Sequence, residues 1–248
     1  MKNILITGAT SGMGLCLAKY MNQINYNLFT VGKDVKKVIN LKKILSTKNK
    51  KNCYQFNLND KKNFKKFCQK LSKKKFDVIF HCMGGGFGKH ETLIKQKDLE
   101  ELFNVNVGIA VEINREIIDK NNYNKNLKII HVSSVAGIEA TASVGYSMVK
   151  AALIAYAKTL SKRLIKKNIY VHCVLPGAFE YENNAFARLK LKNKKVYKKF
   201  IKEKLPLQKI ASAENFLGLF KLLISNEGNI LSGSSVTADY SESNSFRI

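Results

Sequence analysis

Two side chains four residues apart, Tyr146 and Lys150, could together carry out acid–base chemistry. In a helix, residues at this spacing lie on one face, about one turn apart. An ammonium group near a phenol favours the phenolate and lowers the tyrosine pKa from its usual value of ~10. Tyr146 could then exchange a proton near neutral pH. The spacing is common in helices, however, and alone it favours a tyrosine on a core face and a lysine in solvent.

A glycine-rich turn follows the first apolar segment of the chain. Residues 3–7 are typical of a short buried strand, and a helical apolar pattern begins near Leu15. Glycines let the backbone approach phosphates, and a helix N-terminus supplies free N–H donors and a positive dipole end. We expect a dinucleotide pyrophosphate here rather than a plain turn. The contacting residues would be Gly8, Thr10, Ser11, Gly12, Met13 and Gly14.

The end of the second expected strand, 27–31, should lie near the adenosine ribose. An acidic residue there accepts a hydrogen bond from the 2′-hydroxyl of NAD, whereas a basic residue suits the 2′-phosphate of NADP. Gly32 occupies the strand end, Lys33 follows it, and Asp34 is expected to point elsewhere. This favours NADP(H) over NAD(H), unless Lys33 is simply one more surface lysine.

Two further features point to a ligand near the middle of the chain. Four glycines occur between Gly84 and Gly88, which suggests backbone close to a ligand rather than a merely mobile loop. The long helical pattern over 95–120 contains Asn104 and Asn106. Asparagine is unfavourable inside a helix because its side chain competes for backbone hydrogen bonds. One of the two is therefore expected to mark a helix distortion with a polar role.

Strands and helices alternate along the whole chain. Strands are expected at 3–7, 27–31, 53–56, 77–81, 127–132, 169–175 and 234–238, and helices at 15–21, 35–46, 60–74, 95–120, 145–167 and 212–225. This alternation predicts an α/β protein with a single-domain Rossmann fold: a doubly wound parallel sheet of about seven strands with helices on both faces. The domain would span 1–248, with the Lys-rich segment 178–205 as a substrate lid over the sheet.

The chain carries a formal net charge of +25, which raises the question of a nucleic-acid partner. Nearly all its basic residues are lysines, with arginine only at 115, 163, 188 and 247. Readers of DNA sequence favour arginine for its bidentate geometry. We therefore expect a solvated Lys-rich surface and no nucleic-acid partner, although DNA binding stays open as an alternative. A phosphorylated ligand would benefit from the positive field in either case.

Composition also bears on location and metal binding. No apolar run is long enough to span a bilayer, and no signal peptide is recognisable at the N-terminus, so a cytoplasmic protein without a membrane partner is expected. The five cysteines have no zinc-type spacing, and their odd number suggests reduced, mostly buried thiols. The four histidines are isolated and are interpreted as structural. We therefore expect no metal site.

In this order, the motifs resemble those of the classical short-chain dehydrogenase/reductase family over residues 3–240. T-G-A-T-S-G-M-G at 7–14 matches the family's T-G-x-x-x-G-x-G, and Y-S-M-V-K at 146–150 matches Y-x-x-x-K. Ser134 lies 12 residues before Tyr146, where the family has its catalytic serine. Asn106 matches the catalytic asparagine, and Pro176 and Gly177 match the P-G after the sixth strand.

The sequence also departs from the family pattern, which suggests a divergent subgroup. The family's N-N-A-G is replaced by His-Cys-Met-Gly at 81–84, and its threonine after P-G by the run Ala-Phe-Glu-Tyr at 178–181. The interval from Ser134 to Tyr146 is about one residue shorter than in many members, which makes Ser133 a reserve candidate for the catalytic serine.

The resemblance implies hydride transfer between a nicotinamide and a carbonyl or alcohol carbon. Tyr146 would exchange the proton, Ser134 would hold the substrate oxygen, Lys150 would assist Tyr146 and bind the nicotinamide ribose, and Asn106 would hold a water on a proton path. The implied cofactor contacts also include Lys33, Gly84, Tyr146, Lys150, Pro176 and Gly177. Glu139, Phe179 and Glu182 are candidates for the substrate side.

These features together favour an NADPH-dependent ketoreductase. Its substrate would be a small carbonyl or alcohol, phosphorylated or nucleotide-linked, such as a sugar for surface-polysaccharide synthesis. A 3-oxoacyl-carrier-protein reductase and a non-catalytic NAD(P)-binding regulator remain alternatives. The resemblance further implies a homodimer or homotetramer formed through the helices at 95–120 and 145–167.

Overall fold

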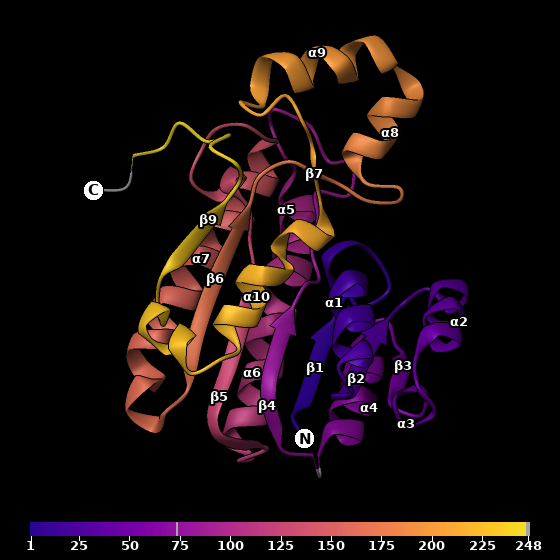
Figure 1. The fold of residues 1–248 in the computed structure, drawn as a ribbon, viewed down its shortest axis with the longest axis vertical. Coiled ribbons are helices and arrows are strands. Elements are labelled where there is room, and N and C mark those ends of the chain that lie inside the picture. Colours follow the sequence, from indigo (N-terminus) through magenta and orange to yellow (C-terminus); the bar gives the residue numbers. More distant parts are fainter. Residues whose placement is uncertain (73, 247–248) are drawn as a thin grey trace.

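The computed structural model describes residues 1–72 and 74–246 (Figure 1). Seven strands form one sheet in the order β3-β2-β1-β4-β5-β6-β9, and all neighbouring pairs are parallel. They are β1 (Asn3–Thr7), β2 (Asn27–Gly32), β3 (Cys53–Gln55), β4 (Phe76–His81), β5 (Tyr123–Val132), β6 (Tyr170–Pro176) and β9 (Ser235–Ala238). The expected seven-stranded doubly wound sheet is therefore confirmed.

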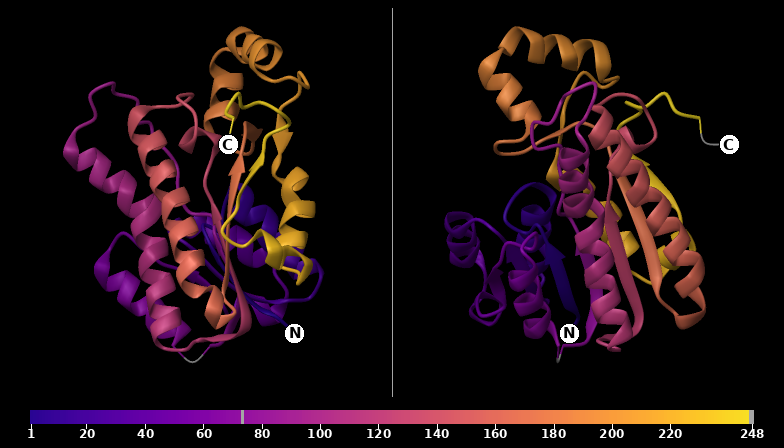
Figure 2. Two further views of the ribbon diagram at one scale, coloured as in Figure 1. Left: turned by 90° about the vertical axis from the view of Figure 1, so that its left-hand side faces the viewer. Right: turned by 180° about the vertical axis from the view of Figure 1, so that it is seen from behind.

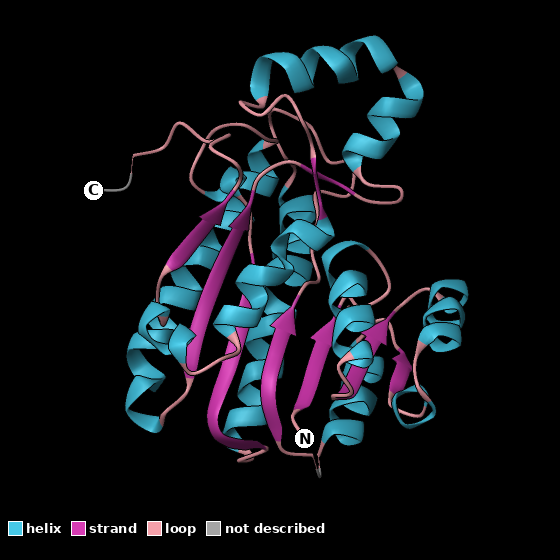
Figure 3. Cartoon of the chain, in the orientation of Figure 1, coloured by secondary structure: helices cyan, strands magenta, loops and turns pink. Residues whose placement is uncertain are grey.

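Helices cover both faces of the sheet, as the two further views and the cartoon show (Figures 2 and 3). One hydrophobic core lies under α1 (Gly12–Gln23), α2 (Val35–Ile44) and α10 (Leu217–Leu223). The other lies under α4 (Lys61–Leu71), α6 (Ile109–Asp119) and α7 (Val144–Leu164). The central strands read as continuous apolar runs because both of their faces are buried, and Val78, Ile79 and Phe80 are fully buried.

The helix expected over 95–120 is interrupted in the middle. Helix α5 (Gln96–Phe103) passes into a π-helical turn at Asn104–Gly108, and α6 continues from there. The expectation that an asparagine marks a distortion is confirmed, since Asn106 lies at the centre of this turn. π-Helical turns often occur at functional sites because they redirect a side chain without ending the helix.

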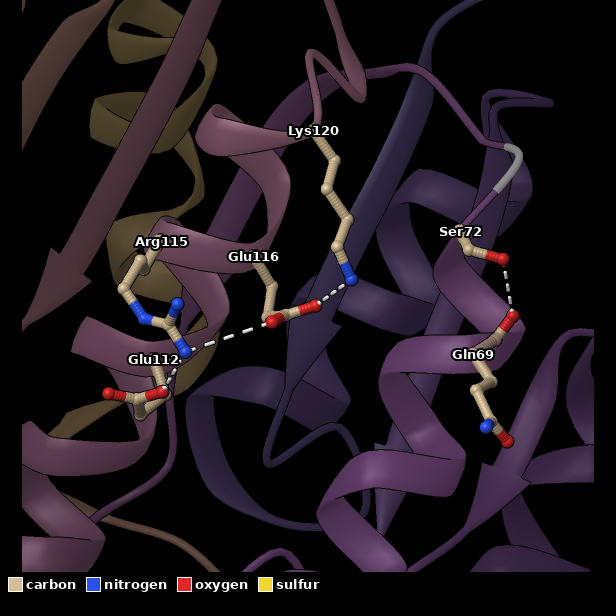
Figure 4. A network of polar contacts seen from close by, with 6 residues as sticks. All are labelled: Gln69, Ser72, Glu112, Arg115, Glu116 and Lys120. Atoms are coloured by element: carbon tan, nitrogen blue, oxygen red, sulfur yellow. Dashed lines mark hydrogen bonds and ion pairs between the residues drawn. The ribbon is translucent and has the colours of Figure 1, made fainter.

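The solvent-facing side of α6 carries exposed ion pairs (Figure 4). The Arg115 guanidinium lies 2.8 Å from the Glu112 carboxylate and 3.7 Å from that of Glu116, and the Lys120 ammonium lies 2.5 Å from Glu116. Nearby, at the end of α4, the Ser72 hydroxyl donates to the Gln69 carbonyl at 2.8 Å. Because such exposed pairs are screened by water, they contribute little to stability.

The carboxyl ends of the strands face the segment that follows β6. This segment contains β7 (Phe179–Glu180), α8 (Ala185–Lys192), α9 (Lys194–Lys204) and β8 (Ala211–Ser212), with β7 and β8 paired in parallel. Figure 1 shows α8 and α9 standing above that end of the sheet. The strand order reverses at β1, which lies between β2 and β4, and ligands of open α/β sheets bind at such a switch point.

Some sequence expectations fall partly outside the described residues. The helix expected over 60–74 ends at Leu71, and Lys73 is not among the described residues. Arg247 and the last residue of the polar C-terminal tail also lie outside them. None of the described helices is long and apolar enough to cross a bilayer.

Candidate active site

An open pocket of about 2020 Å³ lies over the carboxyl ends of the strands. The residues assigned from the sequence to the cofactor or to the chemistry line this pocket, with two exceptions. Gly14 is buried behind the glycine-rich turn, and Asn106 is buried behind the loop that follows β4. The fold thus brings residues from distant parts of the chain to one place.

The glycine-rich turn has a backbone conformation that favours glycine at two positions. Gly8 and Gly12 have φ angles of 66° and 49°, in the left-handed region that favours glycine. A Cβ on Gly14 would lie 2.3 Å from the Gly8 carbonyl oxygen. Helix α1 begins at Gly12, and the side chain of Ser11 makes no capping hydrogen bond. The first N–H groups of the helix are therefore not used by a side-chain cap, which suits an anion.

The Asn106 side chain holds the loop after β4 against the π-helical turn. It is buried, its Oδ1 accepts from the Gly85 N–H at 3.0 Å, and its Nδ2 donates to the carbonyls of Gly85 at 3.1 Å and Leu102 at 2.9 Å. A Cβ on Gly84 would lie 2.5 Å from Asn106 Oδ1 and 3.1 Å from Lys150 Nζ. Gly84 is therefore the point where the loop, the π-helical turn and α7 meet.

The two adjacent serines have different roles in the structure. Ser133 is buried and donates to the Lys150 backbone carbonyl at 2.9 Å, so its hydroxyl is committed to α7. Ser134 lines the pocket, its hydroxyl accepts from the Ala136 N–H at 3.2 Å, and it is close enough to Tyr146 to lower the pKa of the phenol. The geometry favours Ser134 over the reserve candidate Ser133 as the serine that meets a substrate.

Tyr146 and Lys150 do not titrate as the sequence argument expected. Burial raises the pKa of Tyr146 to about 12, and the nearby Ser134 hydroxyl only partly opposes this. The Lys150 ammonium lies 5.5 Å from the centre of the Tyr146 ring and is not among the causes of the shift. The expected lowering of the Tyr146 pKa by Lys150 is not part of this shift and stays a prediction. At neutral pH Tyr146 is a phenol, ready to donate a proton.

Lys150 is itself buried, and it is held by the end of β5. Its Nζ donates to the Val132 carbonyl at 3.1 Å. Burial lowers its pKa to about 8, because removal from water disfavours the charged form. The side chain stays mostly cationic at neutral pH, but it can change its charge within the working range of an enzyme.

The position of the first asparagine in the family's N-N-A-G is occupied by a structural histidine. The ring of His81 stacks on that of His131, with centroids 4.7 Å apart, and its Nε2 lies 2.8 Å from Asn114 Oδ1. Burial lowers its pKa to about 4, so the ring is neutral at physiological pH. This agrees with the interpretation of the histidines as structural.

The adenosine end of the pocket lacks a free carboxylate at the end of β2. A Cβ on Gly32 would lie 2.4 Å from the Thr10 side chain, so glycine is required there. The Asp34 carboxylate caps α2 by accepting from the Lys37 N–H at 2.8 Å. Lys33 and Lys37 both line the pocket. Asp34 also lines the pocket, so its expected orientation away from the ligand is not borne out, although its Oδ1 is used by the helix cap.

In the sequence, Tyr181 stands out only as part of a departure from the family pattern. A Cβ on Gly12 would lie 2.9 Å from Cζ of the Tyr181 ring, so the ring tip rests against the start of α1. The Tyr181 phenol is also close enough to raise the pKa of Tyr146. It therefore stands between the glycine-rich turn and Tyr146. The position of Tyr181, four residues after Gly177, places it near the pocket. The sequence does not reveal the direction in which its side chain points.

Several carboxylates also line the pocket. The candidates Glu139, Phe179 and Glu182 all line it, together with Glu242, which the sequence argument did not find. Glu242 accepts from the Ala178 N–H at 2.5 Å, and its pKa is raised by burial and by the neighbouring carboxylates, Glu139 included. Glu139 Oε1 is buried and has no hydrogen-bond partner among the described residues.

The segment above the pocket is tied together by contacts from β7. Glu180 accepts hydrogen bonds from the Lys190 ammonium at 2.9 Å and the Tyr197 hydroxyl at 2.6 Å. The rings of Phe186 and Phe200 pack with centroids 5.2 Å apart. Elsewhere in the described chain, no group of three His, Cys, Asp or Glu residues is placed to hold a metal ion.

Comparisons with known proteins agree with this geometry. The family model described as short chain dehydrogenase matches residues 2–192. The 3-oxoacyl-[acyl-carrier-protein] reductase FabG of Rickettsia conorii is 26% identical over 236 residues, which cover 95% of this chain and 94% of that protein.

Solved structures show the same fold at lower identity. The NADPH-dependent reductase YwfH, involved in bacilysin biosynthesis, superposes with a TM-score of 0.85 at 20% identity and covers 99% of both chains. The L-sorbose reductase of Gluconobacter frateurii, in complex with NADPH and L-sorbose, also gives 0.85, at 21% identity, covering 99% of this chain and 97% of that one.

The buried Lys150 gives a testable dependence of stability on pH. Because its pKa falls from 10.5 to about 8 on folding, the unfolded state binds more protons between these values, and stability rises with pH there. The shift corresponds to about 3 kcal/mol at about 1.4 kcal/mol per pKa unit. In urea unfolding, we expect the wild type to gain up to about this much relative to Lys150→Met between pH 8 and pH 10.5.

The matched control is Lys198→Met, which removes an exposed lysine of α9. Its difference from the wild type should stay flat over the same pH range. A flat difference for Lys150→Met as well would show that the Lys150 ammonium is not desolvated in the folded protein.

Proposed function

The chain belongs to the short-chain dehydrogenase/reductase family of oxidoreductases, and on that basis we propose that it is an NADPH-dependent ketoreductase. The observation that carries the proposal is the placement of Ser134, Tyr146 and the buried Lys150 on the wall of one pocket, with Lys150 one helical turn from Tyr146. At neutral pH the Tyr146 phenol carries the proton that the reduction of a carbonyl consumes. This supports reduction of a carbonyl as the favoured direction.

The residues of the pocket divide the reaction between them. The nicotinamide, when bound, supplies the hydride that adds to the carbonyl carbon. Tyr146 donates its proton to the carbonyl oxygen as negative charge develops there, so the product is an alcohol. Ser134 donates a hydrogen bond to the same oxygen and orients it toward Tyr146. The carbonyl carbon thus receives the hydride with its electron pair, and the carbonyl oxygen receives the proton.

Lys150 and Asn106 support this step in different ways. Lys150 remains mostly cationic, lies one helical turn from Tyr146 on the pocket wall, and would bind the nicotinamide ribose. The Asn106 side chain hydrogen-bonds to the backbone of Gly85 and Leu102. It therefore acts by holding Gly84 beside the Lys150 ammonium. A proton path through water near Asn106 would restore the Tyr146 phenol and is part of the proposal.

The preference for NADPH is supported by the adenosine end of the pocket. Gly32 cannot carry a carboxylate, Asp34 is committed to capping α2, and Lys33 lies on the pocket wall. A 2′-phosphate would therefore meet the Lys33 ammonium, while one oxygen of the nearby Asp34 carboxylate is held by the helix cap. The relatives FabG and YwfH carry reductase names, and the YwfH name specifies NADPH.

The substrate end favours a molecule with several hydrogen-bond donors. Glu139 and Glu242 place carboxylate oxygens there, and carboxylates accept hydrogen bonds from hydroxyl groups. We therefore propose a keto sugar, free or nucleotide-linked, as the substrate class. The second candidate is a 3-oxoacyl-carrier-protein, favoured by the name of the Rickettsia relative and by the Lys-rich α8 and α9, which would attract an acidic carrier.

The remaining expectations stay proposals. A non-catalytic NAD(P)-binding regulator is the less economical alternative, because the complete set of Asn106, Ser134, Tyr146 and Lys150 surrounds one pocket.

We also propose a cytoplasmic homo-oligomer formed through α5, α6 and α7. Phe103 on α5 and Met148 on α7 are apolar side chains that the single chain leaves half-exposed.

The cofactor proposal predicts that NADPH binds more tightly than NADH in a fluorescence titration. Lys33→Ala should weaken NADPH binding about tenfold, because a charge-assisted contact to the 2′-phosphate is lost, and should leave NADH binding unchanged. Lys36→Ala is the matched control, since Lys36 is an exposed lysine of the same segment that does not line the pocket. Tighter binding of NADH by the wild type would contradict the proposal.

The substrate proposal is tested by NADPH consumption with keto sugars, nucleotide-linked keto sugars, 3-oxoacyl thioesters and simple ketones. We expect a keto sugar to give a kcat/KM at least ~10-fold above that of the thioesters. Glu139→Gln should raise the KM for the sugar while leaving the rate with a simple ketone nearly unchanged. A preference for the thioesters would reject the sugar and favour the second candidate. Cofactor binding without turnover of any compound would favour the non-catalytic regulator.

A further inference from the structure

A second, smaller pocket lies at the amino ends of the strands, at the opposite edge of the sheet from the active site. It has a volume of about 220 Å³, enough for roughly seven water molecules. Its lining consists of three lysines, one aspartate and two asparagines: Lys2, Lys125, Lys128, Asp77, Asn126 and Asn226. In Figure 1 this edge is near the N-terminus, far from α8 and α9.

Lys128 is the unusual residue in this pocket. It lies within β5, between Val78 of β4 and Tyr170 of β6, and it is 3% exposed. Its Nζ donates to Asn229 Oδ1 and lies 3.9 Å from the centre of the Tyr170 ring. No ion pair involves Lys128 among the described residues. A buried ammonium without a counter-charge is costly, since it has lost its water.

The neighbouring groups increase the positive charge. Lys2 donates to the Ile224 carbonyl at 2.9 Å, and its charge acts together with burial to lower the pKa of Lys128 to about 8. Lys128 is still mostly protonated at neutral pH. Lys125 stands exposed at the mouth of the pocket. His172, also near Lys128, has its pKa lowered to about 4 and adds no charge.

The single carboxylate of the pocket is engaged by uncharged groups. Asp77 accepts from the Asn3 N–H at 2.7 Å and from Asn124 Nδ2 at 2.9 Å. It forms no ion pair with the three lysines in the part of the chain that the structure describes. The pocket is thus lined by three lysines and by the side-chain amides of Asn126 and Asn226. Its one carboxylate, that of Asp77, already accepts hydrogen bonds from other groups.

We propose that this pocket binds a small multivalent oxyanion, namely inorganic phosphate or pyrophosphate. Such an anion would give the buried Lys128 the counter-charge that it lacks and would relieve its repulsion by Lys2. Its oxygens would also accept from the asparagine amides at the mouth. The volume suits one or two phosphoryl groups and excludes a dinucleotide, so the site is distinct from the cofactor pocket. The proposal does not depend on the proposed reductase activity.

The test is a calorimetric titration of the full chain with inorganic phosphate and, separately, pyrophosphate in 0.15 M NaCl. Comparison of variants is required because the glycine-rich turn can also bind phosphate. We expect Lys128→Met to weaken binding at least ~10-fold and Lys125→Gln to weaken it by roughly threefold, since each removes a charged donor. The matched control, Lys198→Met, removes one exposed positive charge on α9 and should bind as the wild type does.

Two results would overturn the proposal. One is a wild type that binds neither anion at concentrations up to about 10 mM, where even a weak site of this kind would be detected. The other is equal affinity in the wild type and Lys125→Gln, which would place the anion at another site. Circular dichroism checks whether Lys128→Met is folded. If Lys128→Met is unfolded, the comparison of Lys125→Gln with Lys198→Met tests whether the anion binds in this pocket.

Discussion

The hydrogen bonds of the Asn106 side chain are the contact on which the candidate active site depends. They link the π-helical turn between α5 and α6 to both polar groups of Gly85, and this brings Gly84 to the Lys150 ammonium. A buried amide suits this contact, because its oxygen can accept from the Gly85 N–H while its nitrogen donates to the Gly85 carbonyl. The contact also requires a helix that is distorted at that point, since a regular helix would direct residue 106 elsewhere. The position of the loop after β4 follows from these two features, and so does the shape of the pocket above it.

Burial has opposite effects on the two ionisable groups of this site. It raises the pKa of Tyr146 and lowers that of Lys150, because in each case it disfavours the charged form. The Tyr146 phenol therefore stays protonated at neutral pH, while the Lys150 ammonium begins to lose its proton near pH 8. A proton donor held as a neutral acid next to a serine hydroxyl suits the reduction of a ketone. The loss of water therefore dominates the Tyr146 pKa, and Lys150 is not among the causes of its shift.

Local pattern predicted much of the molecule. The alternation of apolar strands and amphipathic helices predicted the parallel sheet, and an asparagine within a helical pattern predicted the distortion at Asn104–Gly108. The order of the motifs identified the residues that now line one pocket. Properties that arise from packing between distant segments could not be predicted in this way. These include the placement of the Tyr181 ring against Gly12, the approach of Glu242 to Ala178, and the burial of Lys128 beneath the segment that carries Asn229. For a lysine in a chain with so many lysines, nothing in the sequence separates the buried one from its exposed neighbours.

The central claim is that Tyr146 donates the proton during hydride transfer in the pocket built by Asn106, Ser134 and Lys150. The most direct measurement is the single-turnover rate of NADPH oxidation by stopped-flow absorbance, in the wild type and in Tyr146→Phe, with the ketone that the wild type reduces best. The account predicts a rate lower by ~10²–10⁴-fold in the variant, with NADPH affinity unchanged, because only the proton donor is lost. An unchanged rate in Tyr146→Phe would contradict it.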